Sequence, residues 1–297
     1  MMRNILAILL LVSVVSIDAQ QIQQYSQFFM NDFALNPGIA GLRDNIEVRS
    51  NNRYQWEGIV DAPRTYTLSL NVPMANENVG LGAYIFTDIA GPTRRIGFQA
   101  GGAYHIPLND NMQLGVGFSV GVLEYSIDGE KISLAEEGDQ ALLSLLGTTR
   151  VVDAKVGLIL NAEDFYVGLS IPQIAQNNLD IYEGSSAGSS TLATHYYLTG
   201  GYRYQINDDY TIEPNIMLKY VDPAPLKADI SVRGIWRDMV WLGGSYRNND
   251  AFVAMLGVKL YDKILIGYSH DFSTTKIQNY TSGTHEIMLG LDIPRPL

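Results

Sequence analysis

Apolar and polar positions alternate along most of this chain with a period of two residues, most clearly from Met112 to Leu123. Between residues 112 and 122 every even position is apolar, whereas the odd positions are glycine, serine or glutamine. Such alternation places the two sets on opposite faces of a β-strand. A tilted strand crosses a bilayer in about 9 to 11 residues, with apolar side chains toward lipid and small or polar ones toward a lumen. The run therefore predicts a membrane-spanning strand.

The same period recurs in many segments after residue 45. The predicted strands are residues 45–54, 65–73, 78–88, 93–107, 111–126, 152–161, 164–172, 193–206, 209–221, 227–237, 239–247, 250–261, 263–273 and 284–293. A soluble sandwich seldom repeats an alternation of this length so often in one chain. Turn-forming connections at residues 207–209, 247–250 and 261–263 are typical of antiparallel neighbours. An even number of such strands closes without an edge. We predict an all-β fold, an antiparallel transmembrane β-barrel of about 14 strands over residues 45–297.

The first nineteen residues have the pattern of a signal peptide. Arg3 supplies a positive charge, residues 5–17 form an apolar run, and a small residue, Ala19, precedes the expected cleavage point. The run is too short for a membrane helix. A chain that is exported without a long apolar helix can sit in a membrane only as a barrel, which places it in the bacterial outer membrane.

Residues 20–44 differ from everything that follows. Tyr25, Phe28, Phe29 and Phe33 recur at three- and four-residue spacing before a helix-ending Asn-Pro-Gly at 36–38, which predicts a short helix. Two roles remain open for this helical segment. It either caps one mouth of the barrel or forms a plug inside the lumen.

Composition excludes several classes of protein. The net charge is −11 and the acidic residues are scattered, so no nucleic acid is expected as a partner, because phosphate binding needs a clustered basic face. The chain has no cysteine, which excludes disulfides, a cysteine-based zinc site and a lipid anchor on cysteine.

The four histidines give no recognisable catalytic or metal motif. None has the spacing of a helical metal site such as His-Glu-x-x-His. Ser269, His270 and Asp271 are the residue types of a catalytic triad. Adjacent strand residues point to opposite faces, so these three side chains cannot converge. Glycine pairs such as Gly115 and Gly117 are better explained as small inward-facing residues than as a phosphate loop. We expect no enzyme activity, catalytic residue, metal or cofactor, although an outer-membrane lipase could assemble a site across strands.

Two connections are long enough to meet a partner. They are residues 128–150, which contain six charged residues before an apolar run, and residues 173–192, which end in a Gly/Ser-rich stretch. Long loops of single-chain barrels face the outside and short turns face the periplasm. We expect contact with a partner in the first, whereas the Gly/Ser stretch has the composition of a flexible linker.

Several blocks of sequence resemble the PorP/SprF family of outer-membrane proteins of the type IX secretion system. The blocks are residues 25–41, 53–58, 61–65, 80–82, 88–92, 266–273 and 282–290, and they match in order and spacing over nearly the whole mature chain. Two features depart from the family pattern. His270 stands where the family usually has tyrosine, and the sequence ends at Leu297 where many members carry a longer tail.

The resemblance implies a noncatalytic barrel of the secretion and gliding machinery. Its expected partners are a secreted adhesin or other cargo with a C-terminal targeting domain, the type IX translocon, periplasmic components and outer-membrane lipid. The family blocks supply the residues expected to contact a partner or to hold the plug. They are Tyr25, Gln27, Phe28, Asn31, Asn36, Pro37, Arg53, Gln55, Trp56, Pro63, Asp88, Tyr268, Asp271, His285 and Glu286.

Two questions stay open at this point. Arg53, Gln55 and Trp56 either order the lumen beside the helix, or Trp56 belongs to an interfacial girdle and Arg53 is solvated. The alternative function is an outer-membrane channel or a hydrophobic-substrate transporter with an N-terminal hatch.

Overall fold

A computed structural model describes residues 22–75, 78–132, 148–179 and 190–295 of the chain. The main sheet contains the strands β1 (Asn45–Tyr54), β2 (Arg64–Pro73), β3 (Val79–Ala90), β4 (Thr93–Asn109), β5 (Met112–Ile127), β6 (Thr148–Ala162), β7 (Phe165–Ile171), β10 (His195–Tyr202), β11 (Tyr204–Gln205), β12 (Tyr210–Val221), β13 (Lys227–Trp236), β14 (Val240–Arg247), β15 (Ala251–Leu260), β16 (Ile264–Ser273) and β17 (Thr284–Pro294). A separate two-stranded sheet pairs β8 (Asn178–Leu179) with β9 (Ser190–Thr191).

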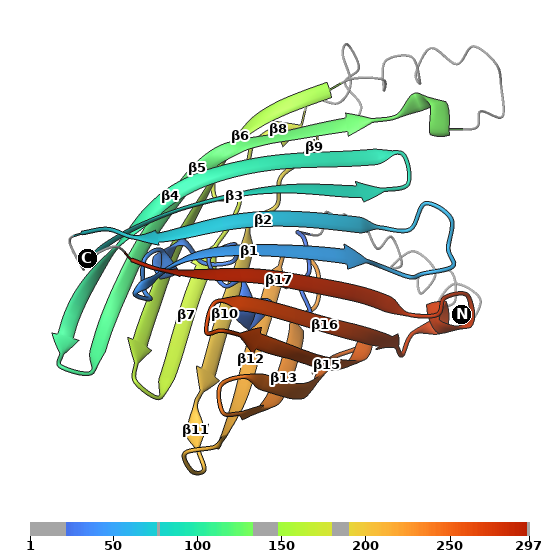
Figure 1. The fold of residues 1–297 in the computed structure, drawn as a ribbon. Helices are drawn as coiled ribbons and strands as arrows, with labels where there is room; N and C mark the ends of the chain where they lie inside the picture. The colour runs from blue at the N-terminus through green and yellow to red at the C-terminus, as the bar shows by residue number, and fades with distance from the viewer. Residues whose placement is uncertain (1–21, 76–77, 133–147, 180–189, 296–297) are drawn as a thin grey trace, which may run out of the picture.

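The main sheet closes into an antiparallel barrel (Figure 1). Each strand pairs with its sequence neighbour, and β1 pairs with β17 from Asn45 opposite Pro294 to Tyr54 opposite His285. The short β11 continues β10 along the same edge of β12, so β10 and β11 count as one strand of a fourteen-stranded barrel. All fourteen predicted strands are confirmed. The largest difference is the start of β6, which lies four residues earlier than predicted because its pairing with β5 extends to Ser126 opposite Thr148.

Side chains alternate across the barrel wall as the two-residue period predicts. In β5, Val116, Phe118, Val120 and Val122 are exposed on the outside, whereas Ser119 is buried inside. Several tyrosines near strand ends are exposed on the outer surface. They include Tyr104, Tyr202, Tyr220 and Tyr246. An apolar outer band with aromatic side chains near its margins is the surface that a lipid bilayer covers.

The two mouths of the barrel differ. One carries the longer connections, including residues 55–63 and 274–283, and η4 (Gly129–Lys131) and η5 (Lys276–Asn279) lie there. The other carries short turns such as residues 110–111 and 261–263. Much of the two longest connections, at residues 133–147 and 180–189, lies outside the described residues. The loop-length rule predicts that the first mouth is extracellular and the second periplasmic.

Residues 22–44, called the lumen segment below, lie inside the barrel. The segment meets Glu286 near the long-loop mouth and Asn71 near the short-turn mouth, so it runs along the lumen before β1 begins. The predicted short helix is wrong. The segment forms only two 3₁₀ turns, η2 (Phe28–Met30) and η3 (Pro37–Ile39).

The lumen segment does not form an α-helix because many of its backbone groups make hydrogen bonds to the barrel wall or between residues three apart, in place of the four-residue spacing of an α-helix. Met30 N–H donates to the Gln27 carbonyl over 3.0 Å, for example, and Ala40 N–H to the Pro37 carbonyl over 3.1 Å. Within the described part of the chain, no helix has both the length and the apolar character needed to cross a membrane.

Candidate functional site

Four residues from distant parts of the chain converge near the long-loop mouth, around Ser26. Glu286 accepts hydrogen bonds from the backbone N–H groups of Ser26 (2.8 Å) and Gln27 (3.1 Å). The Ser26 hydroxyl donates to Asp271 over 2.8 Å. Arg53 donates to Ser26 Oγ over 2.7 Å and to Asp271 over 2.7 Å, and it lies 3.3 Å from Glu286. All four side chains are buried, so this group, the Ser26 latch, fixes the lumen segment to β1, β16 and β17.

Arg247 extends the Ser26 latch to β13 and β14. It donates to Asp271 over 3.0 Å and to Asp229 over 3.1 Å, and it also pairs with Asp250 at 3.2 Å. Ser245 donates to the same Asp229 carboxylate. A buried charge is tolerated only when it is paired and hydrogen-bonded, and these ions satisfy one another. Much of the charge at this end of the lumen is therefore buried in ion pairs.

A second set of bonds holds the middle of the lumen segment. The Tyr25 hydroxyl lies 2.8 Å from Thr67 Oγ1 of β2. Asn31 donates to Asn51 over 2.8 Å and accepts from Ser69 over 2.7 Å. The segment is therefore fixed to β1 and β2 by neutral pairs as well as by charges.

Carbonyl groups of the lumen segment receive donors from other strands. Lys155 of β6 donates to the Ala34 carbonyl over 2.6 Å, and Ser170 of β7 donates to the Leu35 carbonyl over 2.8 Å. His105 Nε2 lies 2.7 Å from the Ala40 carbonyl. Because a buried carbonyl without a partner is costly, these side chains replace the missing helical bonds.

Inward-facing glycines make room for the turn at Pro37. A Cβ at Gly117 would lie 2.3 Å from the Gly38 nitrogen, and a Cβ at Gly157 would lie 1.9 Å from Asn36 Oδ1. Asn36 itself donates to the Leu158 carbonyl over 2.8 Å. The small inward residues predicted for β5 thus serve close packing against the lumen segment.

Apolar side chains of the lumen segment fill the space between opposite walls. Phe28, Phe29 and Met30 pack in one cluster with residues such as Met255 and Met288. Phe33 and Ala34 pack in a second cluster with Tyr84, Phe86 and other residues of the opposite half. The described lumen is consequently occupied along the path of the segment.

The structure brings together many, but not all, of the predicted site residues. Those on the lumen segment or its latch are Tyr25, Gln27, Phe28, Asn31, Asn36, Pro37, Arg53, Asp271 and Glu286, all of them buried. Asp88 is also buried, where it pairs with Arg95 and accepts from Thr65 over 2.7 Å. Arg53 is therefore buried against the lumen segment and not solvated.

Five predicted residues lie away from the lumen segment. Gln55, Trp56 and Pro63 belong to the β1–β2 connection, where Gln55 N–H donates to the Pro63 carbonyl (2.9 Å) and Trp56 N–H to Thr284 (3.1 Å). Trp56 lies beyond the end of β1, where its backbone turns to positive φ. Tyr268 and His285 point outward from β16 and β17.

Sequence reasoning missed Arg247, Asp229, Lys155 and Ser170. A polar side chain at an inward position of a membrane strand is the signal that could have found them, since such a residue needs a partner in the lumen. Ser269 and Asp271 face inward and His270 faces outward, so the apparent triad does not form.

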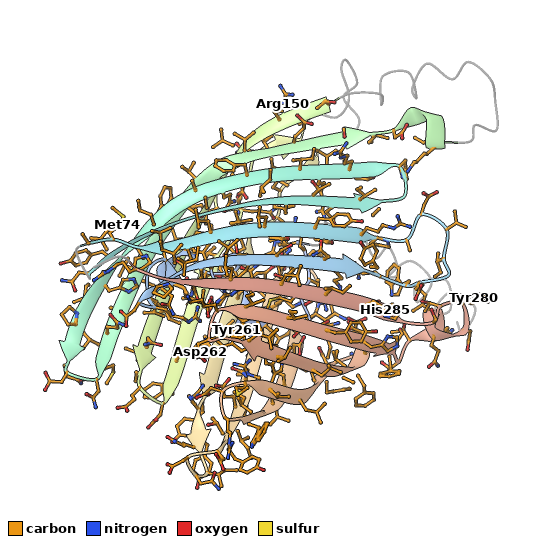
Figure 2. All side chains as sticks on the ribbon, in the orientation of Figure 1. Met74, Arg150, Tyr261, Asp262, Tyr280 and His285 are labelled. Atoms are coloured by element: carbon orange, nitrogen blue, oxygen red, sulfur yellow. The ribbon has the colours of Figure 1, made fainter. Side chains whose placement is uncertain are left out.

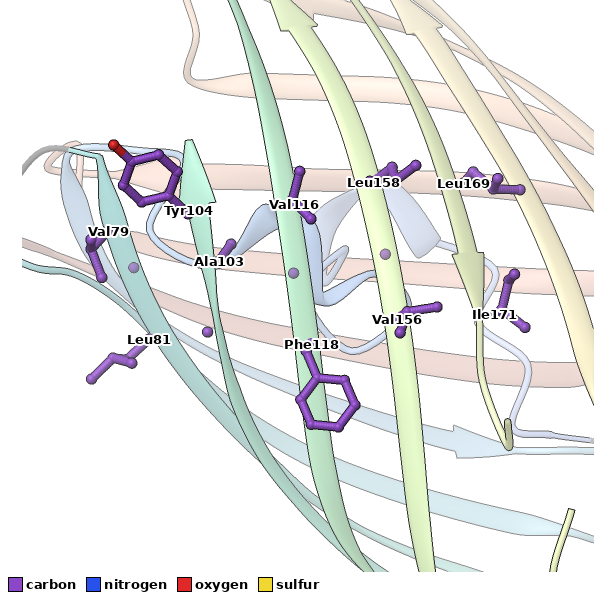
Figure 3. A pocket seen from close by; sticks show the side chains of 14 residues that line it. Val79, Leu81, Ala103, Tyr104, Val116, Phe118, Val156, Leu158, Leu169 and Ile171 are labelled. Carbon is purple, nitrogen blue, oxygen red and sulfur yellow. The ribbon is translucent and has the colours of Figure 1, made fainter. Parts of the chain in front are cut away.

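The outer wall carries an apolar groove. Its volume is about 530 Å³, and Figure 3 shows apolar side chains such as Leu81, Phe118 and Leu158 around it, with the lumen segment on the far side of the wall. Because the groove lies in the lipid-facing band and its lining is apolar, it offers no polar chemistry to a substrate.

These features define a class: an outer-membrane β-barrel of porin-like fold whose lumen holds its own N-terminal segment. The chain belongs to the type IX secretion system membrane protein family PorP/SprF, whose family model matches residues 17–291. The family is one of membrane proteins of this secretion system.

Solved structures resemble the chain at low sequence identity. The TodX deltaS2S3 mutant monoaromatic hydrocarbon channel has a TM-score of 0.51 at 10% identity, over 89% of this chain and 94% of that one. A Pseudomonas aeruginosa FadL homologue gives 0.46 at 10% identity, over 87% and 92%. The KdgM porin gives 0.42 at 13% identity, over 82% and 98%. Comparison with curated proteins finds no match. The likeness to TodX concerns the barrel fold alone.

Proposed function

We propose that this barrel docks or anchors secreted surface proteins that carry a C-terminal targeting domain, as a component of the type IX secretion and gliding machinery. The observation that carries the proposal is the lumen segment, fixed by the Ser26 latch near one mouth and by Asn71 and His105 near the other. A lumen filled in this way favours a barrel that presents a binding surface to a partner and not a channel that passes solutes. Cargo then meets the long-loop mouth, and translocon and periplasmic partners meet the short-turn mouth.

Two connections at the long-loop mouth offer a shared surface to cargo. Glu57 N–H donates to the Gly283 carbonyl over 2.8 Å, and Ser282 N–H donates to the Glu57 carbonyl over 2.9 Å, which joins the β1–β2 and β16–β17 connections. Val60 is 88% exposed and Tyr280 is 76% exposed on this joined rim. Exposed apolar side chains on a hydrogen-bonded rim favour contact with another protein.

Deletion of residues 25–36 tests the role of the lumen segment. We expect the barrel to insert normally while the cargo adhesin appears in the medium, because the rim loses its support from inside. A matched double variant, Val60→Ser with Tyr280→Ser, leaves the lumen segment in place and tests the rim alone. Cargo retained at the cell surface in both variants would count against docking at this mouth.

The alternative function, a channel or hydrophobic-substrate transporter with an N-terminal hatch, makes the opposite prediction for conductance. In planar bilayers the purified wild-type barrel should be silent, and the deletion variant should open ion-conducting pores. Pores in the wild type would favour the channel instead. Cross-linking from the outer membrane would then identify which partner, if any, the long-loop mouth contacts.

A further inference from the structure

Two histidines face each other on the outer side of the wall near the long-loop mouth. His270 of β16 stands directly opposite His285 of β17 in the strand register, and their Nδ1 atoms are 3.4 Å apart. The Tyr268 hydroxyl lies 2.6 Å from the same His285 Nδ1. Figure 2 shows His285 at the end of the barrel that also carries Tyr280. Two possible ligand atoms, the Tyr268 oxygen and His270 Nδ1, therefore lie close to a third, His285 Nδ1, on the outer surface.

The other ring nitrogen of His285 fixes its tautomer. Nε2 lies 2.7 Å from a Glu57 carboxylate oxygen, and an ionised carboxylate can only accept a hydrogen bond. In the neutral ring Nε2 therefore carries the hydrogen, and Nδ1 presents a lone pair. That lone pair faces both the Tyr268 oxygen and His270 Nδ1, although it can accept only one hydrogen bond well. A shared cation would satisfy these atoms together.

We propose that Tyr268, His270 and His285 form a binding site for a divalent transition metal such as Zn²⁺. Imidazole nitrogens bind zinc at about 2.0–2.1 Å, and two nitrogens 3.4 Å apart then subtend close to a tetrahedral angle. No group of three His, Cys, Asp or Glu side chains suits a metal in the described chain, so the third protein ligand is the Tyr268 oxygen. The fourth position is left for water or for a side chain of a partner.

Glu57 completes the arrangement as an orienting residue. Histidines that bind metals commonly donate their other N–H to a carboxylate, which fixes the ring and raises its basicity. Glu57 is 61% exposed, so the site is open to water at the rim. Nitrogen ligands favour Zn²⁺ or Cu²⁺ over Mg²⁺ or Ca²⁺. Because Glu57 lies in the β1–β2 connection, bound metal would also fasten that connection to β16 and β17.

The test is a zinc titration of the full-length barrel in detergent, purified with a tag free of histidine and stripped with a chelator. Competition against a chromophoric chelator should give one Zn²⁺ per chain. Glu57→Gln should weaken binding about 10- to 100-fold, as expected for an orienting carboxylate. His270→Asn and His285→Gln should abolish stoichiometric binding, and Tyr268→Phe should weaken it. The matched control Tyr246→Phe, an outward tyrosine that packs on Phe252, should bind as the wild type does.

A second readout separates metal binding from loss of structure. Co²⁺ substituted into the wild type should give the intense visible bands of a tetrahedral site, and these should change in Tyr268→Phe while the folded barrel keeps its heat-modifiable migration on gels. The proposal is overturned if the wild type takes up no more Zn²⁺ than the double variant His270→Asn, His285→Gln. It is equally overturned if the Tyr268 and Glu57 variants bind as tightly as the wild type.

Discussion

Replacing Glu286 by alanine should release the lumen segment while leaving the barrel closed. The carboxylate accepts two backbone N–H groups, from Ser26 at 2.8 Å and from Gln27 at 3.1 Å, and it faces Arg53 at 3.3 Å. Alanine in its place leaves both N–H groups without that acceptor inside the barrel. The strand pairing of β17 uses only backbone groups and is unaffected.

The magnitude follows from the bonds lost. Each hydrogen bond to a charged group contributes about 1.5–3 kcal/mol, and breaking a buried ionic contact by removing one partner costs about 3–5 kcal/mol. We therefore expect the free energy that holds the segment in the lumen to fall by about 3–5 kcal/mol. Since about 1.4 kcal/mol changes an equilibrium tenfold, the open population should rise between about a hundredfold and a few thousandfold.

Cysteine labelling measures this population directly, because the natural chain has no cysteine. Ala34→Cys places one thiol at a buried position of the lumen segment with little change in volume. When opening and closing are fast relative to labelling, the rate of maleimide reaction follows the open fraction. The control is Glu124→Ala, which removes a rim pair with the largely exposed Arg150 and should change the rate by only a few fold.

One outcome would refute the role assigned to Glu286. If the thiol introduced by Ala34→Cys reacts at the same rate with and without Glu286→Ala, while the barrel retains its heat-modifiable migration, the Ser26 latch does not hold the segment. Labelling accelerated to the same extent in the Glu124→Ala control would show that the effect is not specific to the latch.

Two further variants test the packing and the orientation of the wall. Gly117→Val should destabilise the lumen segment by about 1–3 kcal/mol, because the new side chain would overlap the Gly38 backbone, and labelling of the Ala34→Cys thiol should accelerate. In the control Gly234→Ala the new Cβ would lie 4.0 Å from its nearest neighbour, so the labelling rate should not change. Leu256→Arg should destabilise the folded barrel in lipid vesicles by about 2–4 kcal/mol in denaturant titrations, because Leu256 faces outward from the middle of β15, and Leu256→Ala provides the control.

The barrel could be predicted from the sequence because one constraint acts on every strand. A strand such as β5 must present apolar atoms to lipid at every second residue, so its period is visible without knowledge of any partner strand. The direction of the alternation also follows, since Val116 and Phe118 could not face a polar lumen. Strand ends were less predictable where hairpins such as β5–β6 continue beyond the alternation.

The interior was less predictable because it depends on pairs distant in sequence. Arg53 reaches Asp271 across 218 positions and Glu286 across 233, and only the register of β1, β16 and β17 brings them together. The family resemblance identified these residues, but not their geometry. The helix over residues 25–36 failed because the three- and four-residue spacing of its aromatic side chains serves two opposite walls, and partners such as Lys155 take the place of helical hydrogen bonds.

The pairing of β1 with β17 also dictates an order of assembly. The residues around Ser26 donate hydrogen bonds to Asp271 and Glu286, which lie 245 and 260 positions later in the chain. Hairpins added one after another from β1 onward cannot close the barrel or fix the lumen segment until β16 and β17 are present. The lumen segment can be fixed by the Ser26 latch only after β16 and β17 have joined β1, so closing the barrel and enclosing the segment are coupled steps.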